Sequence, residues 1–322
     1  MKGWWQHIIL IVFLGVLSCS LKASSKNSPQ VNTPASQALA DSVAIGFEAI
    51  YQFQFRRADS IRLALQKSHP KHAWTSILTV NYYWWQIITG NDSEALRKEY
   101  LQQINVALKR LDEKEEDLDH LERYTRITLY GFKARIEILN KRYISVVSLL
   151  NSYISNLKTT FDQEPEFEWY YLTSGIYNYY MERAKATHPV LRPYLSLYPK
   201  GDLEKGLEQL ATAQNSTNLL LRTEAEYFLL KINLEEEEAL GEAESNADAL
   251  VTLYPENVFY RYLYYTILLQ QKKLDKALQQ YGQISVHAKL NEQLSETQKA
   301  HFIRLAKEDL TRYYIETGKT GE

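Results

Sequence analysis

Apolar residues recur at helical spacing along most of the chain. In residues 74–89 they fall three to four positions apart, at Ile77, Val80, Trp84 and Ile87. Four further stretches have the same period, at residues 96–111, 121–139, 143–157 and 169–180. This spacing puts the apolar side chains on one face of each helix, where they can pack against a neighbour. We therefore predict an all-α fold of about twelve helices with no strand.

Capping residues mark several of the predicted helix ends. Residues 90–92, Gly-Asn-Asp, end one helix, and the hydroxyl of Ser93 can cap the next. Ser295 and Gln298 have the spacing of a capping box before a closing helix, which Gly318 follows. The chain has only 12 glycines and 8 prolines in 322 residues, too few for the many turns of a sandwich or barrel. Composition and caps together favour long helices with short connections.

Small residues recur at two fixed spacings, 34 and 12 residues. Ala243 and Ala277 are 34 residues apart, and Gly46 precedes Ala58 by 12, the distance that also separates Ala58 from Pro70. This pattern resembles the tetratricopeptide repeat, a 34-residue pair of helices. In that family small residues let neighbouring helices approach closely. The resemblance implies a right-handed α-solenoid of helix–turn–helix repeats over residues 37–317.

Aromatic segments add to this resemblance. Phe53-Gln54-Phe55, the run from Tyr82 to Trp85 and the run from Gly175 to Tyr180 are similar to segments of a group of uncharacterised bacterial tetratricopeptide proteins. Arg62 and Lys231 depart from the repeat pattern, because they occupy places that are usually apolar or small. The likeness implies a fold and no particular chemistry.

The first residues have the pattern of an export signal. Lys2 precedes an apolar run from Ile8 to Leu17, which is too short to span a bilayer, and Cys19 follows. Cleavage directly before a cysteine resembles the lipobox of bacterial lipoproteins. The resemblance implies a signal peptide over residues 1–18, a lipidated Cys19 and, because Ser20 is not acidic, the outer membrane. An ordinary secretory signal with an incidental cysteine is the alternative.

Polar residues dominate the stretch after the cysteine. Residues 19–36 are rich in serine, asparagine, threonine and proline, so they lack the apolar side chains needed for a core. We predict a flexible tether there, which holds the folded domain away from the lipid surface. At the other end of the chain, residues 318–322 form a short tail.

Charge and motif content exclude several functions. The net charge is −2 and no basic stripe occurs, which disfavours binding to nucleic acid. We find no catalytic constellation and no motif for a cofactor. His69 and His72 could share a metal, but Pro70 breaks helical geometry between them, so an exposed turn is the better interpretation. Residues 235–238, four glutamates, are interpreted as a solvated helix end rather than a site for a cation or basic partner.

An insertion interrupts the repeat. Gly175 and Gly206 are 31 residues apart where the repeat has 12, and residues 184–201 carry the excess. Three of its side chains are candidates for binding a partner or ligand: Arg192, Tyr194 and Tyr198. A loop that folds back over an exposed edge is the alternative.

Consecutive aromatic residues give a second set of binding candidates. Trp84, Trp85, Tyr177 and Tyr180 belong to runs that cannot all face one side of a helix, so some are expected to face solvent or a concave groove. Exposed Tyr and Trp are typical anchors of binding surfaces. The alternative is that they fill gaps between helices.

These features predict a membrane-anchored scaffold or adaptor. Its concave face would bind a protein partner of the bacterial envelope, on a side of the outer membrane that the sequence leaves open. The alternative is a solute-binding lipoprotein, with a sugar or apolar ligand in an aromatic-lined pocket. An enzyme is disfavoured, and no cofactor or metal is expected.

Overall fold

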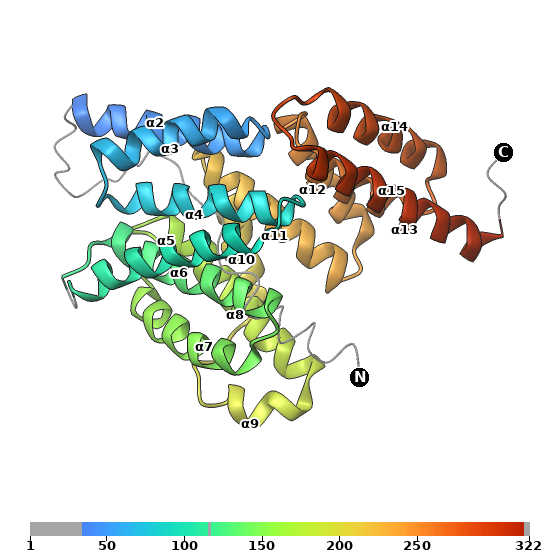
Figure 1. Cartoon of the computed structure of the whole chain (residues 1–322). Coiled ribbons are helices and arrows are strands. Elements are labelled where there is room, and N and C mark those ends of the chain that lie inside the picture. Colours follow the sequence, from blue (N-terminus) through green and yellow to red (C-terminus); the bar gives the residue numbers. More distant parts are fainter. Residues whose placement is uncertain (1–33, 115–116, 319–322) are drawn as a thin grey trace.

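The computed structural model describes residues 34–114 and 117–318 (Figure 1). Within these ranges the chain is all-helical and has no strand, as predicted. Fourteen α-helices are present, two more than the predicted number, and one of them is the four-residue α9. Their bounds are α2 Pro34–Tyr51, α3 Phe55–Ser68, α4 Ala73–Ile88, α5 Glu94–Asp112, α6 His120–Leu139, α7 Tyr143–Leu157, α8 Trp169–Thr187, α9 Arg192–Leu195, α10 Leu203–Gln214, α11 Leu219–Glu235, α12 Leu240–Leu253, α13 Val258–Gln270, α14 Leu274–Leu290 and α15 Glu296–Thr317. Two short 3₁₀ helices cover Lys158–Thr160 and Pro189–Leu191.

Helix ends follow the predicted caps. The Ser93 hydroxyl accepts a hydrogen bond from the backbone N–H of Leu96, at 3.2 Å. Ser295 and Gln298 exchange side-chain and backbone hydrogen bonds as a full capping box at the start of α15. Gly318 follows that helix with φ +64°, a left-handed conformation that glycine adopts at little cost.

Neighbouring helices pack in pairs along the chain. The pairs are α2 with α3, α4 with α5, α6 with α7, α8 with α10, α11 with α12 and α13 with α14, and α15 packs on the last pair. Most side chains of the core form one cluster that runs through all of these pairs except α7. A second, smaller cluster joins α6, α7, α8 and α9. The insertion, which contains α9, therefore packs in the smaller cluster and not in the main one.

Small residues lie where helices touch, as the repeat pattern predicted. A Cβ on Gly46 would come 2.8 Å from a Leu78 methyl group on α4, and Ala58 is buried on α3. Ala243 and Ala277 are also fully buried. Helices α8 and α10 also approach closely, since a Cβ on Gly206 would lie 2.6 Å from the backbone nitrogen of Tyr179.

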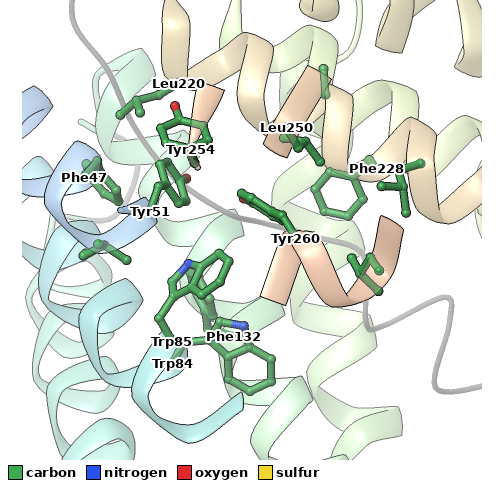
Figure 2. Close-up of a cluster of buried hydrophobic side chains, with 14 of the residues drawn as sticks. Phe47, Tyr51, Trp84, Trp85, Phe132, Leu220, Phe228, Leu250, Tyr254 and Tyr260 are labelled. Carbon is green, nitrogen blue, oxygen red and sulfur yellow. The ribbon is translucent and has the colours of Figure 1, made fainter. Parts of the chain in front are cut away.

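The first helices contact the last ones. Arg56, at the start of α3, donates to the carbonyl of Glu292 before α15, with 2.6 Å between Nη2 and the oxygen. Gln298 of α15 donates to the hydroxyl of Thr89, at 2.8 Å. Figure 2 shows Tyr51 of α2 beside Tyr254, whose ring centre is 5.2 Å away. Helices α2 and α4 thus pack against the C-terminal helices as well as against their sequence neighbours.

Several predictions concern residues outside the described ranges. The predicted signal peptide, Cys19 and the predicted tether up to residue 33 belong to this group. Residues 34–36, predicted as the end of the tether, form the start of α2 instead. Within the described ranges, no helix combines the length and apolar character needed to cross a membrane.

Candidate functional site

Two of the predicted binding residues, Trp84 and Trp85, lie in the core. Their exposed fractions are 4% and 1%. The ring of Trp84 packs beside Tyr100 of α5 and Phe132 of α6, whereas Trp85 packs beside Tyr260 of α13. Because α4 has neighbours on opposite sides, two consecutive aromatic residues are both buried. The prediction of an exposed binding surface is corrected for this pair: these side chains fill gaps between helices (Figure 2).

Tyr177 and Tyr180 of α8 are buried as well, at 5% and 2% exposed. The Tyr177 hydroxyl donates to the carbonyl of Pro199, at 2.7 Å, and its ring lies 5.3 Å from that of Phe161. Burial raises the pKa of both phenols, since the charged form loses its solvation. The correction therefore extends to these two residues, because α8 is covered by the insertion and by α10.

A buried arginine that the sequence analysis did not single out lies among these aromatic residues. Arg135 of α6 is 3% exposed, and its guanidinium carbon lies 5.3 Å from the ring centre of Trp84 and 5.1 Å from that of Phe132. Burial lowers the pKa of Arg135, and the nearby Tyr227 and Glu224 act in the opposite sense. A guanidinium remains charged under these conditions. The charge is therefore held by aromatic faces and by groups on α11.

Several buried polar atoms on the same helices have no hydrogen-bond partner among the described residues. They are Nε1 of Trp85, Oγ1 of Thr128, Oγ of Ser174 and the hydroxyl of Tyr180. Most buried polar groups in proteins do have a partner. These atoms come from three helices, α4, α6 and α8.

The four glutamates of residues 235–238 are not simply a solvated helix end. Glu236 is buried and accepts from Arg183 of α8, with 2.8 Å between Nε and Oε2. Glu237 accepts from the hydroxyl of Tyr179, also on α8, and Glu235 pairs with Lys231. The interpretation is therefore wrong for Glu236, whereas Glu235, Glu237 and Glu238 are exposed at the end of α11, as predicted.

The turn between α3 and α4 opens into a pocket of about 400 Å³. It is lined by His69, Pro70, Lys71, His72, Ala73, Asp119, Leu121 and Glu122. The sequence offered no local carboxylate for His69 and His72, but the fold brings two from the start of α6. Both are engaged, because Asp119 caps α6 and Glu122 pairs with Lys114. In the described part of the chain, no group of three or more His, Cys, Asp and Glu side chains could hold a metal ion.

The insertion folds back onto α7. Tyr198 bonds through its hydroxyl to the side-chain oxygen of Asn151, and its oxygen lies 2.8 Å from that of Tyr194. Both tyrosines are half-buried against the second core cluster. Arg192 is exposed, and its Nε donates to the carbonyl of Lys185, at 2.7 Å. Of the three candidates in the insertion, Arg192 is thus the one that lies fully on the surface.

Helix α7 and the insertion carry a surface of exposed aliphatic and cationic side chains. Ile144 is 91% exposed and Leu197 is 77% exposed, so neither is covered by the chain. Figure 1 shows α7 and α9 as neighbours at one end of the molecule. We refer to this surface as the α7–α9 face, and its members are Ile144, Val147, Val190 and Leu197 with Lys141, Lys158, Arg192 and Lys200.

The charged members of this surface are all cations. Residues 138–161 and 183–201 contain seven lysine or arginine residues, and the nearest acids in sequence border them at Glu137, Asp162, Glu182 and Asp202. Arg142, Arg183 and Lys185 pair with carboxylates that lie just outside these stretches or on α11. The four cations of the α7–α9 face form no ion pair with any described residue. Their charge is therefore available to an anionic partner.

A second exposed apolar surface runs along α14. Leu278, Gly282, Val286 and Leu290 are spaced four residues apart, which aligns them in one row on the helix. The three larger side chains are 38%, 47% and 74% exposed. No atom lies within 4 Å of the position that a Cβ on Gly282 would take. We refer to this row as the α14 stripe.

Comparison of the chain with models of protein families, with characterised proteins and with solved structures finds no match. These comparisons therefore assign no family to the chain.

Proposed function

We propose that this chain is a non-enzymatic, membrane-anchored scaffold of the bacterial envelope, which holds a partner protein on the α14 stripe. The observation that carries the proposal is the stripe itself, an apolar row on a regular helix whose three larger side chains the described chain leaves 38–74% exposed. Such rows are typical of sites that bind an amphipathic helix. The open space at Gly282 leaves room for the backbone of a partner helix to approach closely.

The proposed architecture is a right-handed solenoid of tetratricopeptide-like repeats. It is supported by the six helix pairs, by the closing helix α15 and by the small residues at the contacts. The contacts between α2 or α4 and the C-terminal helices fill the inner side with aromatic side chains of the chain itself. A partner would therefore dock on the outer side, where α14 lies, and not in a concave groove.

Lipidation of Cys19 is the second part of the proposal. Two acyl chains on one cysteine give stable membrane attachment where one chain is marginal. Cells that produce the chain are labelled with an alkyne analogue of palmitate, and the protein is tested for the label. The wild-type chain is expected to be labelled and Cys19→Ser is expected to be unlabelled and released from the membrane fraction. Equal labelling of both would contradict a lipid on this residue.

Photocrosslinking tests whether a partner protein binds the α14 stripe. A photoreactive amino acid is placed at Val286 or Leu290, and intact cells are irradiated. We expect the same partner protein at both positions, joined through an amphipathic helix that mass spectrometry of the crosslinked peptide identifies. The charged substitution Val286→Asp is expected to remove the crosslink from position 290, because it puts a carboxylate into an apolar contact.

A photoreactive residue at Val106 is the matched control, because this valine of α5 is 60% exposed and lies outside the stripe. The proposal fails if Val106 gives the same products as Val286, or if neither stripe position gives a crosslink. If the only crosslinked product were a second copy of this chain, the α14 stripe would be a homodimer interface and not a site for a partner protein.

The unpartnered buried polar atoms favour a second candidate, a solute-binding lipoprotein. Thr128, Ser174 and Tyr180 could bond to the hydroxyl groups of a sugar held between aromatic rings. A panel of sugars is screened for an increase in the thermal unfolding temperature. A sugar bound there should stabilise the wild-type chain more than Tyr180→Phe, and an equal shift in both variants would argue against this site.

A further inference from the structure

We infer that the α7–α9 face binds the anionic headgroups of a phospholipid surface. The inference goes beyond the proposed scaffold function, because it concerns a different surface and does not require lipid on Cys19. It starts from the four exposed aliphatic side chains and the four cations that define this face.

The aliphatic members are arranged to reach into an interface. Ile144 and Val147 are one turn apart on the outer side of α7, and Asn151, one turn further, holds Tyr198 of the insertion. The inner side of α7 is buried in the second core cluster, so the helix lies on the body of the protein with one side free. A helix in this position can place its apolar side chains at the boundary between headgroups and acyl chains.

The cations lie on the same two segments of the chain as these side chains, and none of them is paired with an acidic residue of the described chain. Lys141 and Lys158 lie at the two ends of α7, and Arg192 and Lys200 lie on the insertion. The bond from Arg192 Nε to the carbonyl of Lys185 anchors the base of its guanidinium on the surface. Basic residues beside exposed aliphatic residues are the combination that attracts proteins to anionic lipid.

The charge pattern favours lipid over a protein partner. A protein interface normally contains charges of both signs and a well-packed apolar centre. Here the four charged members of the face are all cations without an ion-pair partner in the described chain, although the net charge of the whole chain is −2. The α7–α9 face and α14 lie at opposite ends of the molecule in Figure 1, so a membrane bound at one end would leave the α14 stripe accessible.

Vesicle binding tests the inference. The mature chain, residues 19–322 with Cys19→Ala, carries no lipid and is mixed with vesicles of phosphatidylcholine alone or with phosphatidylglycerol added. We expect binding only when phosphatidylglycerol is present, and weaker binding as salt increases. Lys141→Glu with Lys200→Glu, and separately Ile144→Ser with Leu197→Ser, should each weaken binding about tenfold or more.

Matched controls change equally exposed residues elsewhere. They are Lys67→Glu with Lys307→Glu for the cations and Val106→Ser with Ile315→Ser for the aliphatic residues. These controls should bind vesicles like the parent. The inference is overturned if the parent does not bind, or if control and face variants lose binding equally. It is also overturned if the face variants keep vesicle binding but lose an acidic protein partner.

A label locates the contact. Cys19 is the only cysteine, so Ile144→Cys in the Cys19→Ala chain can carry one environment-sensitive dye, and Ile315→Cys provides the matched position. Vesicles with phosphatidylglycerol should shift the emission of the dye to the blue at position 144 and leave it unchanged at position 315. Equal spectra at position 144 with and without these vesicles would contradict insertion of this face.

Discussion

The side chain of Asn257 donates a hydrogen bond to the backbone carbonyl of Tyr51, although 206 residues separate them in the sequence. The distance is 2.8 Å and both residues are fully buried. The oxygen of the same Asn257 amide accepts from the N–H of Tyr260 and caps α13. One side chain therefore starts a C-terminal helix and ties it to the end of α2. Nearby, the hydroxyl of Tyr51 donates to the buried carboxylate of Glu224.

Asn257→Asp separates these two roles. A carboxylate can still cap α13, but it cannot donate to the Tyr51 carbonyl, so a buried acceptor is left unpaired beside a negative charge. We expect the free energy of unfolding to fall by about 1–3 kcal/mol, measured by urea denaturation. Asn105→Asp, the same change at an exposed position of α5, should have little effect. Equal stability of Asn257→Asp and the parent would show that this bond does not hold the two ends together.

His72 makes stability depend on pH. The Nδ1 of His72 accepts a hydrogen bond from the backbone N–H of Trp74 and so caps α4. A protonated Nδ1 could not accept this bond, so the cap requires the neutral ring. Burial is the main cause that lowers the pKa of His72 below the ordinary 6.5, and His69 and Arg110 act in the same sense, against Asp119 and Glu122. Below 6.5 the unfolded chain binds a proton that the folded chain resists. The contribution of His72 is therefore complete above pH 6.5 and is lost as the pH falls below it.

His72→Asn is the comparison, since asparagine caps helices well and does not titrate. The difference in unfolding free energy between parent and His72→Asn should move in favour of the variant as the pH is lowered through 6.5. Urea denaturation across that range measures the difference, which removes the contribution of the other titrating groups. A difference that stays constant with pH would contradict the role of the neutral ring.

The pair between Arg183 and Glu236 holds α8 against α11. The side chain of Glu236 is 5% exposed and that of Arg183 is 30% exposed, so the pair is largely removed from water. Glu236→Gln keeps the shape but leaves the guanidinium without its counter-charge. We expect a loss of about 1.5–3 kcal/mol in urea denaturation. Glu238→Gln, at an exposed position of the same run, should change stability by less than about 0.5 kcal/mol. Similar effects of the two substitutions would mean that Glu236 is solvated like Glu238 and that its pair with Arg183 does not stabilise the fold.

The sequence predicted what depends on local pattern. Helix positions followed from the apolar period, the caps at Ser93 and Ser295 from residue type, and the contacts at Gly46 and Ala58 from the repeat. Each of these features depends only on residues that lie within about one repeat of each other in the sequence. Local sequence therefore determines the pairs of helices and where they touch.

The sequence did not predict contacts between distant helices. Trp85 packs against α13, which lies far along the chain, and the partner of Glu236 lies on α8. Burial of Arg135 was not predicted either, because one of its two aromatic partners, Trp84, lies on α4, although the other, Phe132, is on the same helix. The exposed side of α7 is likewise visible only once the structure shows which of its apolar residues remain uncovered.

Two glycines should respond to the same substitution with opposite signs. Gly206 faces the backbone of α8, where a Cβ would lie 2.6 Å from the nitrogen of Tyr179, so Gly206→Ala must push two helices apart. Backbone cannot rearrange as a flexible side chain can, and we expect a loss of about 1–3 kcal/mol. Gly241 of α12 has no atom within 4 Å of its Cβ position. Gly241→Ala should gain up to about 1 kcal/mol from helix propensity. Thermal and urea denaturation of both variants provide the test, and a stable Gly206→Ala would show that α8 and α10 do not require the small residue.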